Sequence, residues 1–242
     1  MALELPDAVV SFLDFIGVHW PNVNEDKVRE FAEHVREFSN NLQQSHQDAS
    51  SLVEQLSEVY QGQSYEALMS KWSQMSSGHM QELITACNTV ATALDAAAGV
   101  IVGMKVAAIA ELVALAISFV ADQAAAAVTF GIAEAAEAGI IAAARKATSY
   151  LEQQLEQYVI GEVIEAAITP LVEVVGKAVS GLVYEGTAKA LGVPAGGGGA
   201  GGSFSVHPQE LHARSETLAS HAQTVASHAE NFTSKVSGVS FD

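Results

Sequence analysis

A long run of apolar residues, spaced three and four positions apart, begins shortly after Asn24. Its positions, nine of them apolar and one a serine, are Val28, Phe31, Val35, Phe38, Leu42, Ser45, Ala49, Leu52, Leu56 and Val59. Because an α-helix turns once every 3.6 residues, this spacing places them on one narrow face, the pattern of a coiled-coil seam. Asn24 is positioned to cap the helix, and the carboxylates of Glu25 and Asp26 suit its first turn.

A second periodic stretch follows the short sequence Tyr60-Gln61-Gly62. Its apolar positions are Tyr65, Leu68, Trp72 and Met75 and, beyond a polar break at Ser76–Gly78, Leu83, Ala86, Val90, Ala93 or Leu94, and Ala97. Gly62 can adopt a positive φ without a steric penalty, and Ser64 is expected to cap a helix that starts at Tyr65. The two stretches predict an antiparallel helical hairpin over residues 24–98.

Other helical patterns flank the hairpin. Residues 6–18 predict a short amphipathic helix with Pro6 in its first turn. The side chains available for burial there are Val9, Val10, Phe12, Leu13 and Ile16. Residues 99–191 are rich in Ala and predict further apolar helices that pack against the hairpin. Because no sustained alternation of apolar and polar residues indicates strands, the chain is predicted to be all-α.

The Gly-rich segment 192–206 is the clearest predicted domain boundary, since such a composition behaves as a flexible linker. It separates a helical domain at residues 1–191 from an amphipathic helix at residues 207–242. The apolar stripe of that helix is Leu211, Ser215, Leu218, Ala222, Val225, Ala229, Phe232 and Val236. A single helix cannot bury such a stripe alone. It is therefore expected to dock back, to pair with another chain, or to be half of an incomplete second hairpin.

The net charge of −17, from 28 acidic and 11 basic residues, limits the partners that the chain can have. Nucleic acids and anionic lipid surfaces are bound through clusters of Lys and Arg, which this chain lacks. The acidic residues are expected to form a solvated surface rather than a docking site. We therefore expect no nucleic-acid partner.

Residues 96–144 are the most apolar part of the chain, which raises the question of a membrane span. Asp95, Lys105, Glu111 and Asp122 interrupt the segment, whereas a span needs roughly 18 or more uncharged apolar residues. A helix packed inside the protein is therefore favoured. A pore-lining helix with a narrow polar stripe stays an alternative.

Residues that carry catalytic or metal chemistry do not form a recognisable constellation. His221 and His228 share a helix face but lie roughly 10 Å apart along the axis, too far for one ion. Cys87 lies on the apolar seam and is expected to be a buried structural thiol. We expect no enzymatic activity, no metal and no cofactor. The first residues, MALELPDAVV, do not resemble a cleavable secretory signal peptide.

The turn resembles that of the WxG family of helical hairpins exported by type VII secretion systems. In that family a Trp-x-Gly turn joins two antiparallel helices; here Tyr60 stands in place of the Trp, followed by Gly62 and, on the second helix, Trp72. The order of MALELP, GVHWP at 17–21, NEDKVREFA, YQGQSYEAL and an Ala-rich segment resembles more specifically the N-terminal domain of actinobacterial polymorphic toxins of the outer-membrane-channel and necrotizing-toxin type.

That resemblance covers about residues 1–192 and implies an export and delivery domain. A channel role has also been assigned to such a domain. The segment after residue 203 resembles the first helix of another type VII substrate hairpin. Relatives carry a Tyr-x-x-x-Asp/Glu export signal, which Tyr158 and Glu162 match. Relatives also pair with a partner hairpin, and Ser45 and Ser76–Gly78 are candidates to set that register.

The leading hypothesis is a non-enzymatic type VII secretion substrate, or an export and delivery module of a polymorphic toxin. Tyr60, Gly62 and Trp72 form the predicted recognition motif. Expected partners are the secretion machinery and a helical partner protein or a second copy. The expected location is outside the cell or in the cell envelope, without a cleavable signal peptide. Two alternatives remain: a membrane-active or channel-forming helical protein, and an intracellular coiled-coil scaffold.

Overall fold

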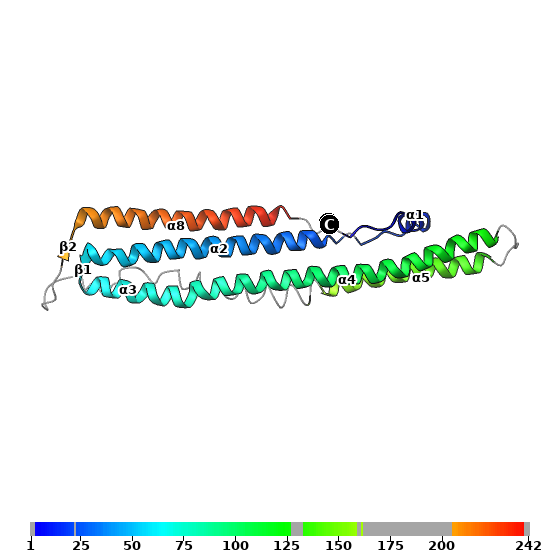
Figure 1. Ribbon diagram of the computed structural model, residues 1–242, viewed down its shortest axis with the longest axis horizontal. Helices are drawn as coiled ribbons and strands as arrows, with labels where there is room; N and C mark the ends of the chain where they lie inside the picture. The colour runs from blue at the N-terminus through cyan, green and yellow to red at the C-terminus, as the bar shows by residue number, and fades with distance from the viewer. Residues whose placement is uncertain (1–2, 22, 127–132, 159–160, 162–204, 240–242) are drawn as a thin grey trace. The chain divides into compact units, whose positions relative to one another are not determined.

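The computed structural model describes residues 3–21, 23–126, 133–158, 161 and 205–239, which are almost wholly helical (Figure 1). The predicted all-α class is confirmed. The helices are α1 (Asp7–Ile16), α2 (Glu25–Gln55), α3 (Gln63–Met75), α4 (Gln81–Ala126), α5 (Ala133–Gln157) and α8 (Pro208–Ser237). Shorter elements are the 3-10 turn η1 (Leu56–Glu58), the π-helical turn η2 (Ser76–Met80), and the strands β1 (Tyr60–Gln61) and β2 (Ser205–Val206).

The chain forms two compact units. The first contains Met1–Phe31, Thr92–Ala166 and Val239–Asp242, and the second contains Ala32–Ala91 and Ala167–Gly238. Both α2 and α4 contribute to both units, and α4 continues without a break past residue 98, where the sequence suggested the end of the hairpin. Of the predicted linker at residues 192–206, residues 192–204 lie outside the described residues and stay a prediction, whereas Ser205 and Val206 form the strand β2.

In the first unit, α1 packs its apolar face against α4 and α5. Pro6 precedes the helix, and Gly17 ends it in the left-handed conformation, with φ 65°. The predicted short helix is thus confirmed, although Val10 is 39% exposed instead of buried. The core consists of Val9, Phe12, Leu13 and Ile16 from α1, Leu112, Ala116 and Phe119 from α4, and Ala144 and Ala147 from α5.

The start of α2 shows both a confirmed cap and an unexpected burial. The Oδ1 of Asn24 accepts hydrogen bonds from the backbone N–H groups of Asp26 and Lys27, at 3.0 and 3.2 Å, as its predicted cap role requires. Glu25 was expected to favour the first turn through its charge alone. It is instead 1% exposed and paired with Lys105 of α4, which is 4% exposed, at 2.6 Å. Lys105 therefore does not belong to an exposed polar stripe.

The predicted seam of α2 is largely confirmed, with three corrections. Phe31, Phe38 and Leu52 are only half-buried, whereas their neighbours Ala32, Ser39 and Val53 are buried. In the second unit, α2 has helices on two sides, so its buried surface is wider than one seam. The hydroxyl of Ser39 lies 3.5 Å from the carbonyl of Ile84 on α4, while the ring of Phe38 stacks on Phe232 of α8.

The π-helical turn η2 lies at the polar break that the sequence shows at Ser76–Gly78. A π turn inserts one extra residue into the α-helical repeat. Beyond it, the predicted positions Val90, Leu94 and Ala97 are buried, and so is Cys87. Only the first turn of α4 differs from the prediction, because Ile84 is buried whereas Leu83 and Ala86 are half-buried.

Candidate functional site

The predicted recognition turn forms at the junction between α2 and α3. η1 ends α2, β1 follows directly, and Gly62 precedes α3 with φ 144° and ψ 176°. That positive φ is accessible only to Gly among the common residues, so the predicted positive φ of Gly62 is confirmed. The predicted cap at Ser64 is wrong, because the helix begins at Gln63. The carbonyl of Gly62 accepts the N–H groups of Tyr65 and Glu66, at 3.0 and 3.2 Å.

Tyr60 of the turn pairs with a segment that is distant in the sequence. β1 and β2 run antiparallel, with Tyr60 opposite Val206 and Gln61 opposite Ser205. The backbone N–H of His207 also donates to the carbonyl of Val59, at 2.9 Å. The start of the C-terminal helix is therefore attached to the predicted recognition turn. Two-residue strands have no periodicity, so the sequence carried no signal for this pairing.

Trp72, the third predicted recognition residue, lies on α3 and contacts α2. Its indole N–H donates to the hydroxyl of Ser50 at 3.0 Å, and its ring stacks on His46 with the centroids 5.4 Å apart. The Nε2 of His46 lies 2.6 Å from the hydroxyl of Ser76, where η2 begins. Burial lowers the pKa of His46 by disfavouring the imidazolium form. Trp72 thus holds α3 against α2, and His46 extends this contact to η2. Tyr60 and Gly62 form the turn itself.

The possible export signal lies largely outside the described residues. Tyr158 follows the last residue of α5, and Glu162 is not described. The proposed signal over these two residues therefore stays a prediction.

Two ion pairs that the sequence did not predict connect α8 to α2 and to the 3-10 turn η1 at its end. The Nζ of Lys235 lies 2.7 Å from Oε1 of Glu37, and Nη2 of Arg214 lies 2.9 Å from Oε2 of Glu58. In each helix, the two charged residues stand about three heptads apart. This matched spacing is a signal that an inspection of charge alone could have found. Ser45, a predicted register residue, lies 3.1 Å from Nε2 of His228.

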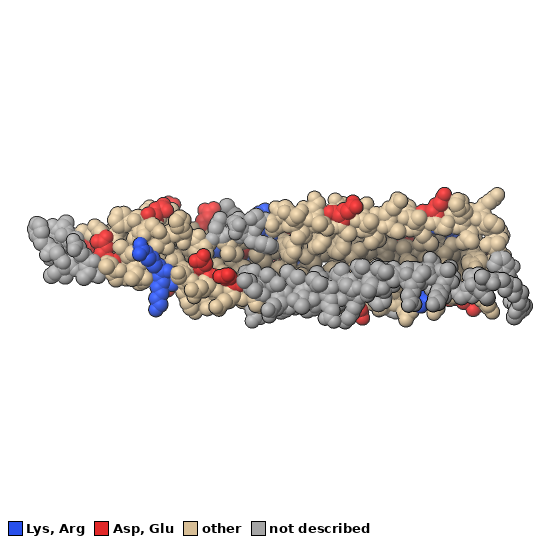
Figure 2. Space-filling view, turned by 180° about the vertical axis from the view of Figure 1, so that it is seen from behind, with Lys and Arg blue, Asp and Glu red and all other residues tan. Residues whose placement is uncertain are grey.

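The charged side chains of the described residues are mostly spread over the surface. On the face in Figure 2, acidic side chains are scattered among uncharged ones, with a few basic side chains between them. Within the described residues, no three His, Cys, Asp or Glu side chains are grouped as a metal site would need. The described part of the chain consists of packed helices and the turn at Tyr60–Gly62, which pairs with β2.

Cys87 is buried in the second unit, as predicted, and is 2% exposed. Burial raises the pKa of its thiol to about 11, because the low-dielectric surroundings disfavour the thiolate.

We therefore expect the native protein to react with Ellman's reagent at least about 100-fold more slowly than the protein unfolded in guanidinium, whose thiol has a pKa of about 8.5. The matched control carries Cys87→Ser and Thr89→Cys, which moves the thiol to an exposed position on the same helix. Equal reaction rates of the native wild type and this control would contradict the expected protection.

Comparison with known proteins identifies the helical hairpin. The model of the WXG100-like domain family matches residues 3–148, more than half of the chain. That range contains α1 to α4, most of α5, and the turn at Tyr60 and Gly62. Neither the curated proteins nor the solved structures give a match. By its matched length and its hairpin, the chain belongs to the WXG100-like family of helical proteins related to type VII secretion.

Proposed function

We propose that the chain is a non-enzymatic type VII secretion substrate, or the export and delivery module of a polymorphic toxin. The observation that supports this most is the WXG100-like domain over residues 3–148, whose hairpin turns at Gly62, a Gly with positive φ two residues after the aromatic Tyr60. In this proposal, the secretion machinery recognises the folded hairpin, and Tyr60 and Gly62 form the recognised turn. The chain then acts outside the cell or in the cell envelope.

A helical partner, or a second copy of the chain, belongs to the same proposal. Helices α3 and α8 contain no buried residue, so each leaves apolar side chains partly open to a further helix. Tyr158 and Glu162 contribute the proposed export signal. The toxin context and an actinobacterial host follow from the resemblance of the sequence and are tested together with export.

The test is export from an actinobacterial host with and without a working type VII ATPase. An N-terminally tagged chain is expected in the culture filtrate only when the ATPase is present. Tyr60→Ala is expected to reduce the exported fraction, whereas Tyr150→Ala, the same change at a residue 63% exposed on α5, is expected to leave it unchanged. Thermal unfolding of both variants separates recognition from folding. Retention of the wild-type chain in both strains would overturn the proposal.

A membrane-active protein is a second candidate, which the surface of α4 favours. By length and composition, Gln81–Gln123 of this helix could cross a membrane. An apolar stretch of 18 residues within it has a mean hydropathy of 2.3, and 28% of that stretch is buried inside the protein. In the first unit, α1 and α4 also line an apolar groove of about 610 Å³. At its edge, Phe15, Ile117 and Val120 are about two-thirds exposed.

Flotation with zwitterionic liposomes tests this candidate. The wild-type chain is expected to float with the liposomes if the groove contacts lipid, and Ile117→Asn is expected to weaken that association. Recovery of the wild-type chain only in the protein fraction would exclude it.

A further inference from the structure

The inner face of α8 is not the apolar stripe that the sequence predicted. Its half-buried positions are Leu211, Arg214, Leu218, His221, Val225, His228, Phe232 and Val236. Three members of the predicted stripe, Ser215, Ala222 and Ala229, are exposed instead. The face therefore alternates apolar residues with a cation and two histidines, and none of its residues is fully buried.

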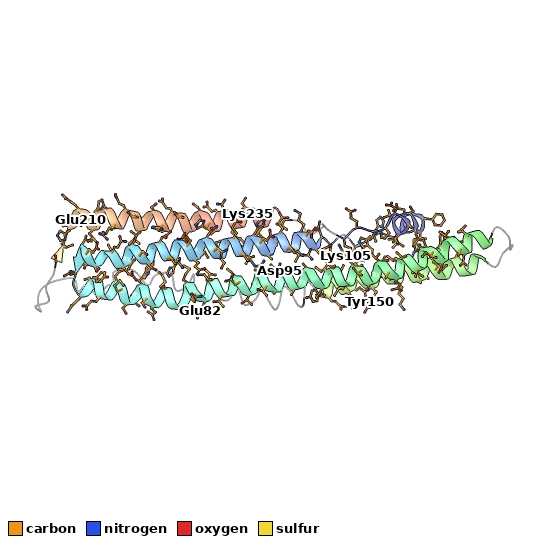
Figure 3. The ribbon with its side chains drawn as sticks, viewed as in Figure 1. Glu82, Asp95, Lys105, Tyr150, Glu210 and Lys235 are labelled. Atoms are coloured by element: carbon orange, nitrogen blue, oxygen red, sulfur yellow. The ribbon has the colours of Figure 1, made fainter. Side chains whose placement is uncertain are left out.

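Polar contacts at both ends fix the register between α8 and α2. At one end, the guanidinium of Arg214 donates to the carbonyl of Gln55 at 2.7 Å and to the carboxylate of Glu58 at 2.9 Å. At the other end, Lys235 binds Glu37. The two ion pairs are separated by roughly 30 Å of helix, so only one antiparallel alignment satisfies both. Figure 3 labels Lys235 on α8.

Between the ion pairs, two contacts fit the same alignment. The rings of Phe38 and Phe232 stack with their centroids 4.7 Å apart and their planes at 19°. Nearer the recognition turn, seven residues beyond Phe38 on α2 and four residues before Phe232 on α8, the hydroxyl of Ser45 lies 3.1 Å from Nε2 of His228. The face of α2 and η1 from Glu37 to Glu58, which we name the acidic-aromatic face of α2, thus matches α8 by charge, by ring stacking and by hydrogen bonding.

The attachment of α8 is nevertheless weak for a helix of its length. Its ion pairs are largely exposed, the carboxylates of Glu37 and Glu58 being 51% and 66% accessible, and exposed pairs stabilise little. The sequence that precedes it, GVPAGGGGAGGS at 192–203, has the composition of a flexible tether, which sets a local concentration in the millimolar range. A contact of this kind opens reversibly and can be remade by another chain.

We propose that the acidic-aromatic face of α2 is a binding surface for α8, occupied within one chain at low concentration and by the α8 of a second copy at high concentration. The fitting partner is an antiparallel helix with two cations about three heptads apart and an aromatic residue close to the second. This deepens the self-association part of the proposed function and rests on it. Its test uses purified protein and needs no secretion. A chain that is not exported can therefore still show whether α8 binds this surface.

Two full-length variants test the surface by exchanging charges. The reversed-face variant carries Glu37→Lys and Glu58→Arg, and the reversed-helix variant carries Arg214→Glu and Lys235→Glu. Each alone has like charges across the contact, so hydrogen exchange in its α8 is expected to be at least 10-fold faster than in the wild type. Mixed in equal amounts, each supplies the complement of the other, and light scattering is expected to show a 1:1 dimer.

A single chain that carries all four changes is expected to recover the slow exchange of α8, because both pairs are restored in reversed order. The matched control reverses the pair Lys27 and Glu30, which lies within α2 and is expected to change neither readout. A monomeric mixture would overturn the binding of a second copy. Wild-type exchange rates in either reversed variant, or fast exchange in the chain with all four changes, would overturn the register.

Discussion

Replacing Lys105 with Met is expected to lower the free energy of unfolding by about 3 kcal/mol at neutral pH. The ammonium of Lys105 lies 2.6 Å from Oε2 of Glu25, and both side chains are almost completely buried in the first unit. The backbone N–H of Leu3 donates to the other oxygen of Glu25. Met keeps most of the packing of the lysine stem but leaves the carboxylate buried with only backbone donors and no neutralising charge. The loss therefore comes from an uncompensated charge.

The pH dependence separates this cause from a simple packing defect. Burial raises the pKa of Glu25, but the hydrogen bond from Lys105, the backbone donors and the Lys105 charge together hold it below its ordinary value of 4.5. The stabilisation from the wild-type pair is thus complete above about pH 4.5 and is lost as the pH falls through the lowered value. In Lys105→Met the carboxyl group can be neutralised by a proton, so the difference between variant and wild type should shrink at acidic pH.

Urea unfolding at pH 7 and pH 4 measures both effects. The double variant Glu25→Met with Lys105→Met removes both charges and is expected to be within about 1.5 kcal/mol of the wild type, since apolar residues can replace a buried pair. The control is Lys27→Met. That lysine pairs with Glu30 while 41% exposed, so solvent screening leaves an effect within about 0.5 kcal/mol. A loss below about 1 kcal/mol for Lys105→Met would show that the buried pair is not maintained in solution.

The parts of the fold that the sequence predicted are those set by local chemistry. The cap at Asn24 needs only a short polar side chain before a helix. The end of α1 needs only a residue that tolerates a left-handed conformation, which Gly17 supplies. The seam of α2 was likewise visible, because one buried face repeats with the period of the helix.

The features that the sequence did not predict depend on residues far apart in the chain. Glu25 and Lys105 are 80 positions apart in the sequence. Taken alone, each is expected to be an exposed charge, and only the folded structure places them together. The pairing of Tyr60 with Val206 depends on where α8 docks, which no local pattern specifies. At Ser76 the polar break was visible in the sequence, but nothing in the sequence showed that it forms a π-helical turn. The turn of the candidate site was therefore predictable, whereas the pairing of that turn with β2 at the start of α8 was not.

The substitution Gly62→Val is expected to lower the free energy of unfolding by about 2–3 kcal/mol. At φ 144° and ψ 176°, the backbone of Gly62 lies in a region that a Cβ atom excludes. Val must therefore move the backbone between β1 and α3, which disturbs the pairing of Tyr60 with Val206 as well as the start of α3. Thermal or urea unfolding measures the loss, and hydrogen exchange at the amide of His207, which donates to the carbonyl of Val59, reports whether the two segments still pair.

Two glycines with different backbone conformations supply the controls. Gly17 has φ 65°, a left-handed conformation that Asn adopts readily, so Gly17→Asn is expected to cost less than Gly62→Asn. Gly99 lies inside α4, and a Cβ there would meet nothing within 4 Å, so Gly99→Ala is expected to stabilise by about 0.5–1 kcal/mol. If Gly62→Val and Gly62→Asn left stability unchanged, the turn would not have this conformation in solution. The recognition role assigned to Tyr60 and Gly62 would then lose part of its structural basis, because the positive φ of Gly62 shapes the turn that presents Tyr60.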